Sequence, residues 1–270
     1  MTANRKAIFI TGAASGIGLA TARRFAAEGW LVGLSDIDGP GLKTALAAIG
    51  GDNAGVTLLH DVRKADEWER ALDAFTEASH GRLDVLVNNA GIARYGWFAE
   101  QTPKDFDDQI NINLRGVILG AYLGHERLKA TPGSRLINIA SLASLSGSPR
   151  MAVYSATKFA VRGLSEALDI EFMRTGVRVS CVEPTVIETP LIDKATAPGG
   201  PSFREAITQA MGGALPVEQA AEVIWRAAHD APLHYPVGDA PAALLQEINP
   251  RIEATREHWR EMFDSGAFGG

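Results

Sequence analysis

The sequence predicts an α/β fold, a doubly wound parallel sheet of about seven strands with helices on both faces. Short β-branched runs alternate with longer segments of helical period over roughly the first 180 residues, as is typical of βαβ units. A glycine-rich turn separates the first predicted strand from the first predicted helix. The 270 residues, 46% hydrophobic and 21% charged, are enough for one large core. We therefore expect a single domain over residues 1–270.

The first predicted βαβ unit occupies the N-terminal part of the chain. Residues 7–11 and 31–36 are largely apolar runs, as expected for strands that are buried on both faces. Between them, residues 17–28 carry apolar side chains at helical spacing, and Gly29 is placed to end that helix.

The later elements continue the same alternation. Further parallel strands are predicted at residues 56–59, 83–88, 135–140 and 177–183, and helices between them at 64–79, 103–130 and 151–175. After Pro184 we expect a loop, helices at 191–211 and 217–229, a short strand at 233–237 and a helix at 243–262. The Pro/Gly stretch 198–201 is interpreted as a loop and residues 265–270 as a frayed tail.

Charge and composition argue against several classes of partner. The formal net charge is −6 and Lys and Arg do not cluster, so we expect no nucleic-acid binding. No run of about eighteen apolar residues predicts a membrane span, and residues 1–6 lack an apolar signal-peptide core. A cytoplasmic location is favoured. Cys181 is the only cysteine, and the apolar run around it predicts a buried, unreactive thiol.

Residues 11–18 carry the chemistry of the first turn. The spacing Gly12-x-x-x-Gly16-x-Gly18 lets the backbone approach a pyrophosphate at the positively polarised N-terminus of a helix. This pattern indicates a dinucleotide site, although the spacing differs from the more general Gly-x-Gly-x-x-Gly. The alternative is a glycine-rich turn without a ligand.

Asp36 ends the second predicted strand, 18 residues after Gly18. A carboxylate near this spacing accepts hydrogen bonds from the adenosine ribose hydroxyls, and it repels a 2′-phosphate. Ile37 follows it, and no Lys or Arg lies between Gly12 and Gly18 to compensate such a phosphate. The sequence therefore predicts NAD rather than NADP, the alternative being a solvated strand end.

Tyr154 and Lys158 stand four residues apart at the start of a predicted helix, which places their side chains on one face. A nearby ammonium and an oxidised nicotinamide both favour the phenolate, so together they would lower the Tyr pKa from about 10. Ser141, at the end of a predicted strand, can point its hydroxyl at the same space. The alternative for the Tyr–Lys pair is a surface or packing contact.

These motifs, in this order, resemble the short-chain dehydrogenase/reductase family over roughly residues 6–190: residues 11–18, Asn88-Asn89-Ala90-Gly91, Asn113, Ser141, and Tyr154 with Lys158. The resemblance implies a Rossmann-like fold. It also implies that Tyr154 is the general acid/base and that Ser141 orients the substrate oxygen. Lys158 would bind the ribose and lower the Tyr pKa, and Asn113 would position a water in a proton relay.

Further residues are implied only by the same resemblance. The implied cofactor contacts are Gly12, Ser15, Gly16, Ile17, Gly18, Asp36, Asp61, Val62, Asn89, Ala90, Gly91, Tyr154, Lys158, Pro184, Ile187 and Thr189. The family is usually dimeric or tetrameric, so we expect a homodimer or homotetramer formed through helices 103–130 and 151–175.

Substrate choice is expected to come from the loops at residues 92–98, 142–151 and 185–213. The candidate substrate residues are Arg94, Ser141, Ala143, Met151, Tyr154 and Thr185. Thr185 stands where the family usually has Gly, which indicates a narrower pocket, a hydroxyl for the substrate or a different loop conformation. A bulky or hydrophobic alcohol is favoured. No metal site is predicted, because His125 has no second His at ligand spacing.

The leading hypothesis is an NAD-dependent oxidoreductase that interconverts a secondary alcohol and a ketone, or a primary alcohol and an aldehyde. One alternative is a non-catalytic, NAD(H)-responsive regulatory or scaffolding protein. Another is an epimerase or dehydratase that recycles NAD within the site.

Overall fold

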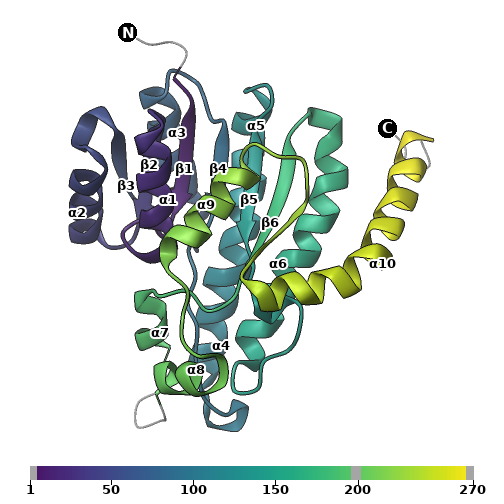
Figure 1. Ribbon diagram of the computed structural model, residues 1–270. Helices are drawn as coiled ribbons and strands as arrows, with labels where there is room; N and C mark the ends of the chain where they lie inside the picture. The colour runs from purple at the N-terminus through teal and green to yellow at the C-terminus, as the bar shows by residue number, and fades with distance from the viewer. Residues whose placement is uncertain (1–4, 196–201, 266–270) are drawn as a thin grey trace.

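The computed structural model describes residues 5–195 and 202–265, and its centre is a seven-stranded parallel sheet (Figure 1). The spatial order of the strands is β3-β2-β1-β4-β5-β6-β7, and every neighbouring pair is parallel. The strands are β1 (Ala7–Thr11), β2 (Leu31–Asp36), β3 (Gly55–Leu59), β4 (Val85–Asn88), β5 (Arg135–Ile139), β6 (Arg178–Pro184) and β7 (His234–Val237). The predicted doubly wound α/β fold is confirmed.

The strand order reverses beside β1. The chain runs from β1 outward through β2 to β3, then returns to place β4 on the other side of β1, where Ile10 pairs with Val87. In such a sheet a crevice opens between the carboxyl ends of the two strands at the reversal, because their connections leave in opposite directions. The fold therefore positions a ligand site at the ends of β1 and β4.

Helices cover both faces of the sheet (Figure 1). They are α1 (Gly16–Ala27), α2 (Gly39–Ile49), α3 (Ala65–Ala78), α4 (Pro103–Ile110), α5 (Gly116–Lys129), α6 (Ala152–Glu171), α7 (Pro190–Lys194), α8 (Phe203–Met211), α9 (Val217–Ala227) and α10 (Asp239–Asp264). Among the described residues, no helix has the length and apolar content needed to cross a membrane.

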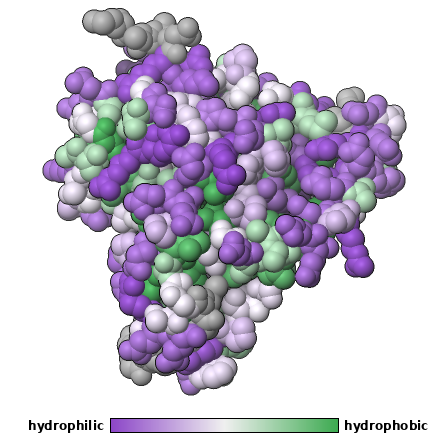
Figure 2. All heavy atoms as spheres, viewed as in Figure 1, coloured by the Kyte–Doolittle hydropathy of each residue, from purple (hydrophilic) through white to green (hydrophobic). Residues whose placement is uncertain are grey.

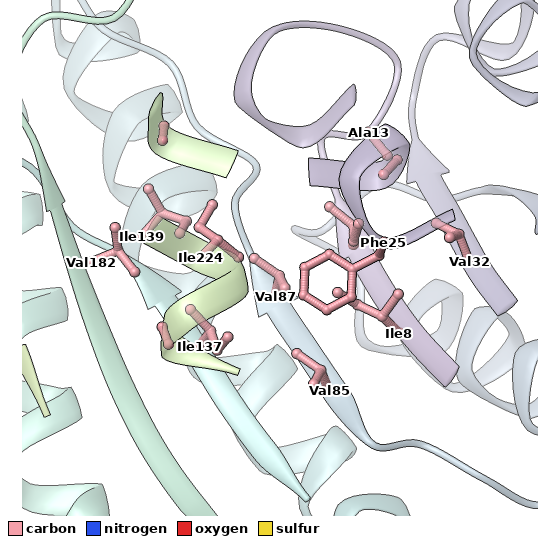
Figure 3. Packing of buried hydrophobic residues seen from close by; sticks show 14 of the residues in the cluster. Ile8, Ala13, Phe25, Val32, Val85, Val87, Ile137, Ile139, Val182 and Ile224 are labelled. Carbon is pink, nitrogen blue, oxygen red and sulfur yellow. The ribbon is translucent and has the colours of Figure 1, made fainter. Parts of the chain in front are cut away.

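Two apolar cores lie on the two faces of the sheet. On one face, Phe25 of α1 and Ile224 of α9 pack against Ile8 and its neighbours in β4 and β5 (Figure 3). On the other face, Phe9 packs against Trp68 and other residues of α3 and α5. Successive residues of β1 thus enter opposite cores, which explains why that strand is continuously apolar.

The structure corrects the predicted helices in two places. Helix α2 was absent from the prediction because Gly39-Pro40-Gly41 is typical of a loop; instead Asp38 caps the helix by accepting a hydrogen bond from the Gly41 N–H at 3.0 Å. The helix predicted at 191–211 is two helices, α7 and α8. The predicted loop at 198–201 lies outside the described residues, as does most of the predicted tail.

Candidate active site

The glycine-rich turn is tied to the end of β4. The hydroxyl of Thr11 accepts hydrogen bonds from the N–H groups of Asn89 and Ala90, both at 3.0 Å, and the Asn89 side-chain amide donates to the Thr11 carbonyl at 2.8 Å. A Cβ atom on Gly18 would lie 2.2 Å from the carbonyl oxygen of Gly12. Close approach between the turn, α1 and β4 therefore requires glycine at this position.

The N-terminus of α1 faces the crevice. Ser15 is the N-cap residue, is exposed, and makes no side-chain cap hydrogen bond. Gly16 has a φ of +54°, and a Cβ atom there would lie 3.1 Å from Cγ2 of Thr189, which precedes α7. The turn therefore offers backbone N–H groups and a hydroxyl at a positively polarised helix end, a set that suits a pyrophosphate.

Asp36 lies beside this turn. One carboxylate oxygen accepts a hydrogen bond from the Ala14 N–H and the other from the Asp38 N–H, both at 3.1 Å. The adjacent Ile37 is 66% exposed and carries no charge. The position of the carboxylate is thus fixed by the turn itself, and the residue that follows it in the chain is not a cation.

Arg63 is a residue near this end of the site that the sequence reasoning missed. It lines the same cavity as Asp36, but its guanidinium is paired with Asp61 at 2.6 Å. The Arg63 side chain holds the pKa of Asp61 below its usual range. Only the structure shows that a cation lies near Asp36, and it also shows that this cation is neutralised.

The three expected reacting side chains converge at the other end of the crevice. Ser141 follows β5, while Tyr154 and Lys158 lie on the first two turns of α6. Ser141 hydrogen-bonds Tyr154, and the Lys158 ammonium lies 5.7 Å from the Tyr154 ring centre. Lys158 donates to the carbonyl of Ile139 at 2.8 Å, which anchors its ammonium against the end of β5.

Burial acts on both titrating groups. It lowers the pKa of Lys158 to about 8, because a buried ammonium loses its hydration. It also raises the pKa of Tyr154, an effect that the hydrogen bond from Ser141 opposes without cancelling. The protein surroundings alone therefore do not give the lowered Tyr pKa that the four-residue spacing suggested.

Asn113 lies in a π-helical turn, Asn111–Arg115, that joins α4 to α5. Its side chain is fully buried, accepts from the Ile92 N–H at 2.8 Å, and donates to the Ile92 carbonyl at 2.8 Å and to the Thr157 hydroxyl at 3.2 Å. Both amide hydrogens are thus used. The side chain joins the segment after β4 to α6, so a water in a relay would have to be held by the backbone of this turn.

One cavity of about 1280 Å³ joins the two ends of the site. Most of the expected contacts line it: Gly12, Ser15, Gly16, Ile17, Asp36, Asp61, Val62, Asn89, Ala90, Gly91, Arg94, Ser141, Ala143, Met151, Tyr154, Lys158, Pro184, Thr185, Ile187 and Thr189. Gly18 and Asn113 do not line it. Beyond the carboxyl ends of the strands lie α4, α7 and α8 (Figure 1).

Thr185 and Arg94 differ in what they present to the cavity. The hydroxyl of Thr185 is buried without a hydrogen-bond partner, while its methyl group faces Gly238. Arg94 is paired with Asp105 at 3.0 Å, so its charge is compensated within the protein. Neither residue presents an unpaired charge to a ligand.

A buried polar cluster on β6 and β7 was also missed. Cys181, Glu183 and His234 place potential metal-ligand atoms within 4.8 Å of one another. However, Nδ1 of His234 lies 2.6 Å from the Glu183 carboxylate, a hydrogen-bonding distance, and burial raises the pKa of the Cys181 thiol. The cluster does not line the cavity, and the predicted burial of Cys181 is confirmed.

Comparison with known proteins agrees with this geometry. The family model described as short chain dehydrogenase matches residues 6–198. The chain is 36% identical to D-threitol dehydrogenase of Mycolicibacterium smegmatis, covering 75% of this chain and 78% of that one. It is 35% identical to the NADP-dependent (R)-specific alcohol dehydrogenase of Lentilactobacillus kefiri, covering 70% and 75%.

A solved structure of a related enzyme is also similar to this chain in three dimensions. The 3-ketoacyl-(acyl-carrier-protein) reductase of Brucella melitensis, complexed with NADH, superposes with a TM-score of 0.76 at 30% identity, covering 86% of this chain and 96% of that one. The resemblance predicted from the motifs is therefore confirmed, and the chain belongs to the short-chain dehydrogenase/reductase family of oxidoreductases.

Proposed function

We propose that this oxidoreductase interconverts a secondary alcohol and a ketone with NAD as the hydride carrier. The observation that carries the proposal is the convergence of Ser141, Tyr154 and Lys158 at one end of a cavity whose other end is the glycine-rich turn. A primary alcohol and aldehyde pair fits the same groups.

The residues present suit a nicotinamide dinucleotide. Gly18 allows a close approach that a Cβ atom would block, and α1 directs its N-terminus at the phosphate position. Asp36, held by the Ala14 N–H of the turn, would hold the adenosine ribose through its hydroxyls and would disfavour a 2′-phosphate. The Brucella neighbour was solved with NADH, whereas the Lentilactobacillus relative is named as NADP-dependent, so Asp36 is the residue that supports NAD here.

The reacting residues have distinct roles in this proposal. When bound, the nicotinamide accepts a hydride from the alcohol carbon or returns it to the carbonyl carbon. Tyr154 takes the hydroxyl proton of the alcohol, or gives a proton to the carbonyl oxygen, and Ser141 hydrogen-bonds that oxygen. Lys158 places a positive charge near Tyr154 and favours the phenolate. Asn113 acts as a positioning residue that holds Ile92 and α6 together.

The test is a panel of secondary alcohols and ketones followed by NADH absorbance, with NAD and NADP in parallel. We expect turnover with NAD that Tyr154→Phe reduces by about 10³-fold or more. The matched control is Tyr122→Phe, because Tyr122 lies on α5 and is 76% exposed. Turnover that survives Tyr154→Phe contradicts the proposed role. Tight NADH binding without any turnover favours the regulatory alternative.

The chain also carries a surface that suits the expected homo-oligomer. Ile118 and Tyr122 on α5 and Phe159 on α6 are 43%, 76% and 43% exposed. These helices are the ones expected to form the subunit contact. Light scattering of the wild type and of a Tyr122→Glu variant tests this part of the proposal, since a monomeric wild type contradicts it.

A further inference from the structure

The cavity beside Tyr154 is apolar. Tyr95, Met151, Leu191 and Phe203 line it and belong, with the Tyr154 ring, to one apolar cluster. Tyr95 and Met151 are only 9% and 7% exposed. Apolar side chains gather in the middle of the visible face, between the sheet and the α7–α8 segment (Figure 2). Carbon therefore makes up one wall of the space next to the reacting hydroxyl, while Ser141 lies on the hydroxyl itself.

Tyr95 is held rigidly in this cluster. Its N–H donates to the Ala195 carbonyl at 2.7 Å, and its ring lies 4.8 Å, centre to centre, from that of Phe203. The guanidinium of Arg150 lies 4.8 Å from the Tyr95 ring centre and donates to its hydroxyl at 3.3 Å. The backbone N–H and the hydroxyl oxygen of Tyr95 are thus held by the protein, and the residue contributes ring carbon to the cavity lining.

The cations that line this end of the cavity are compensated or solvated, whereas Arg150, which lies over the Tyr95 ring and has no ion pair within the described residues, is not part of the lining. Arg94 is paired with Asp105, and Lys104 is paired with Asp108 at 2.5 Å. Lys194 is exposed on α7, so its ammonium stays in water. A carboxylate or phosphate on the substrate would lose its hydration here without gaining a buried, unpaired cation from the described residues that line the cavity.

We propose that the substrate of this site is an uncharged alcohol or ketone whose bulk is an apolar ring or chain, and that Tyr95 is its specificity-determining residue. The inference rests on the proposed function, since it assigns the substrate class of the same reaction. The oxygen of the substrate lies at Ser141 and Tyr154, and its apolar part packs on the ring of Tyr95 between Met151, Leu191 and Phe203.

Three ketones test the substrate class. Acetophenone is apolar, 4-acetylbenzoate has the same ring with a carboxylate, and hydroxyacetone is small and polar. With NADH and the full-length wild type, we expect kcat/KM to be at least about 10-fold higher for acetophenone than for either of the others. A preference for 4-acetylbenzoate or hydroxyacetone, abolished by Tyr154→Phe, overturns the substrate class while leaving the proposed function intact.

Variants at Tyr95 test the residue. Tyr95→Ala is expected to lower kcat/KM for acetophenone by about 10- to 100-fold, because it removes the ring, and to change that for hydroxyacetone by less than about threefold. Tyr95→Phe keeps the ring and removes only the hydroxyl, so it separates the contribution of the ring from that of the contact with Arg150. Phe203→Ala is a second, independent truncation if Tyr95→Ala does not fold. Equal losses for both ketones overturn the assignment of Tyr95.

If no ketone is turned over, a measurement of ketone binding can still test the substrate class independently of the proposed function. Calorimetric titration of acetophenone into the protein–NADH complex is then the measurement. Binding that Tyr95→Ala weakens at least tenfold supports the apolar site and counts against the catalytic proposal. Absence of acetophenone binding overturns the substrate class.

Discussion

The methyl carbon Cγ2 of Thr185 lies 2.8 Å from the position that a Cβ atom on Gly238 would take. The N–H of Thr185 donates to the carbonyl of Val237 at 3.0 Å, so the segments after β6 and β7 are joined at this point. Thr185 stands where the family usually has Gly, and here the glycine is found on the neighbouring segment. The departure is accommodated because Gly238 leaves room for the threonine methyl group.

This pairing predicts non-additive stability. Gly238→Ala is expected to destabilise the protein by about 2–4 kcal/mol, because the φ of Gly238 is +98° and the new methyl group meets Thr185. In a Thr185→Gly background the contact with Thr185 disappears and only the contact with Leu215 at 3.1 Å remains, so the cost of Gly238→Ala falls by about 1–2 kcal/mol. Urea unfolding of the four proteins gives the coupling. If the destabilisations by the two single substitutions add to that of the double variant within about 0.5 kcal/mol, the contact between Thr185 and position 238 is contradicted.

His60 predicts a pH dependence of stability. It is 1% exposed, its Nδ1 lies 2.7 Å from the Ser35 hydroxyl, and burial lowers its pKa from 6.5 to about 4. Between these values the unfolded chain binds a proton that the folded chain does not. The contribution of neutral His60 is therefore complete above pH 6.5 and is lost as the pH falls toward 4.

The expected loss is about 2–3 kcal/mol between pH 7 and 4.5. Urea unfolding at both pH values measures this loss. The wild type and the variant share all other titrating groups, so the difference between the two proteins isolates His60. In His60→Gln the difference in the free energy of unfolding between pH 7 and pH 4.5 is expected to shrink by that amount. His258→Gln, on the exposed side of α10, is the control and keeps the wild-type difference. An unchanged pH dependence in His60→Gln rules out this assignment.

The sheet could be predicted because its signal is local. Strand β1 is continuously apolar since Ile8 and Phe9 enter opposite cores, and its short length and the glycine-rich turn that follows favour a strand over a buried helix. Helix α2 could not, because its start, Gly39 and Pro40, has loop propensity. There the Asp38 cap and the burial of Leu42 outweigh propensity, and burial depends on the rest of the fold.

The site was predictable to the extent that its residues follow one another in recognisable motifs. Helical spacing predicts that Tyr154 and Lys158 share one face, and the resemblance to the family supplies their roles. Partners that are distant in the chain were not predictable: Lys158 binds the carbonyl of Ile139, and Asn113 uses its whole amide on Ile92 and Thr157. These contacts exist only after β5, α6 and the π-helical turn have packed together.

Asp36 predicts how the coenzyme preference can be changed. Asp36→Ser combined with Ile37→Arg removes the carboxylate and adds a cation at an exposed position, so a 2′-phosphate gains a partner instead of a like charge. We expect the ratio of kcat/KM for NAD to that for NADP to fall by about 10²-fold or more. Asp52→Ser, which removes an exposed carboxylate that does not line the cavity, is the control. A wild type that already prefers NADP contradicts the role given to Asp36.

Lys158 predicts a shift in the pH dependence of alcohol oxidation. Burial raises the pKa of Tyr154, so the phenolate depends on positive charge brought close to it, and Lys158 is charged below its own pKa of about 8. In Lys158→Met the rising limb of kcat against pH is expected to move to higher pH, with a loss at pH 7 of about 10²-fold or more that is partly recovered near pH 10.

The measurement is kcat for alcohol oxidation from pH 6 to about 10.5, on either side of the ordinary Tyr pKa of about 10. Lys129→Met is the matched control, because Lys129 is exposed at the end of α5 and, within the described residues, forms an ion pair only with Glu126, at 3.5 Å. A purely structural role for Lys158 lowers kcat equally at every pH. A parallel loss of that kind therefore contradicts electrostatic control of Tyr154, whereas a displaced limb shows that the ammonium sets the protonation of the reacting hydroxyl.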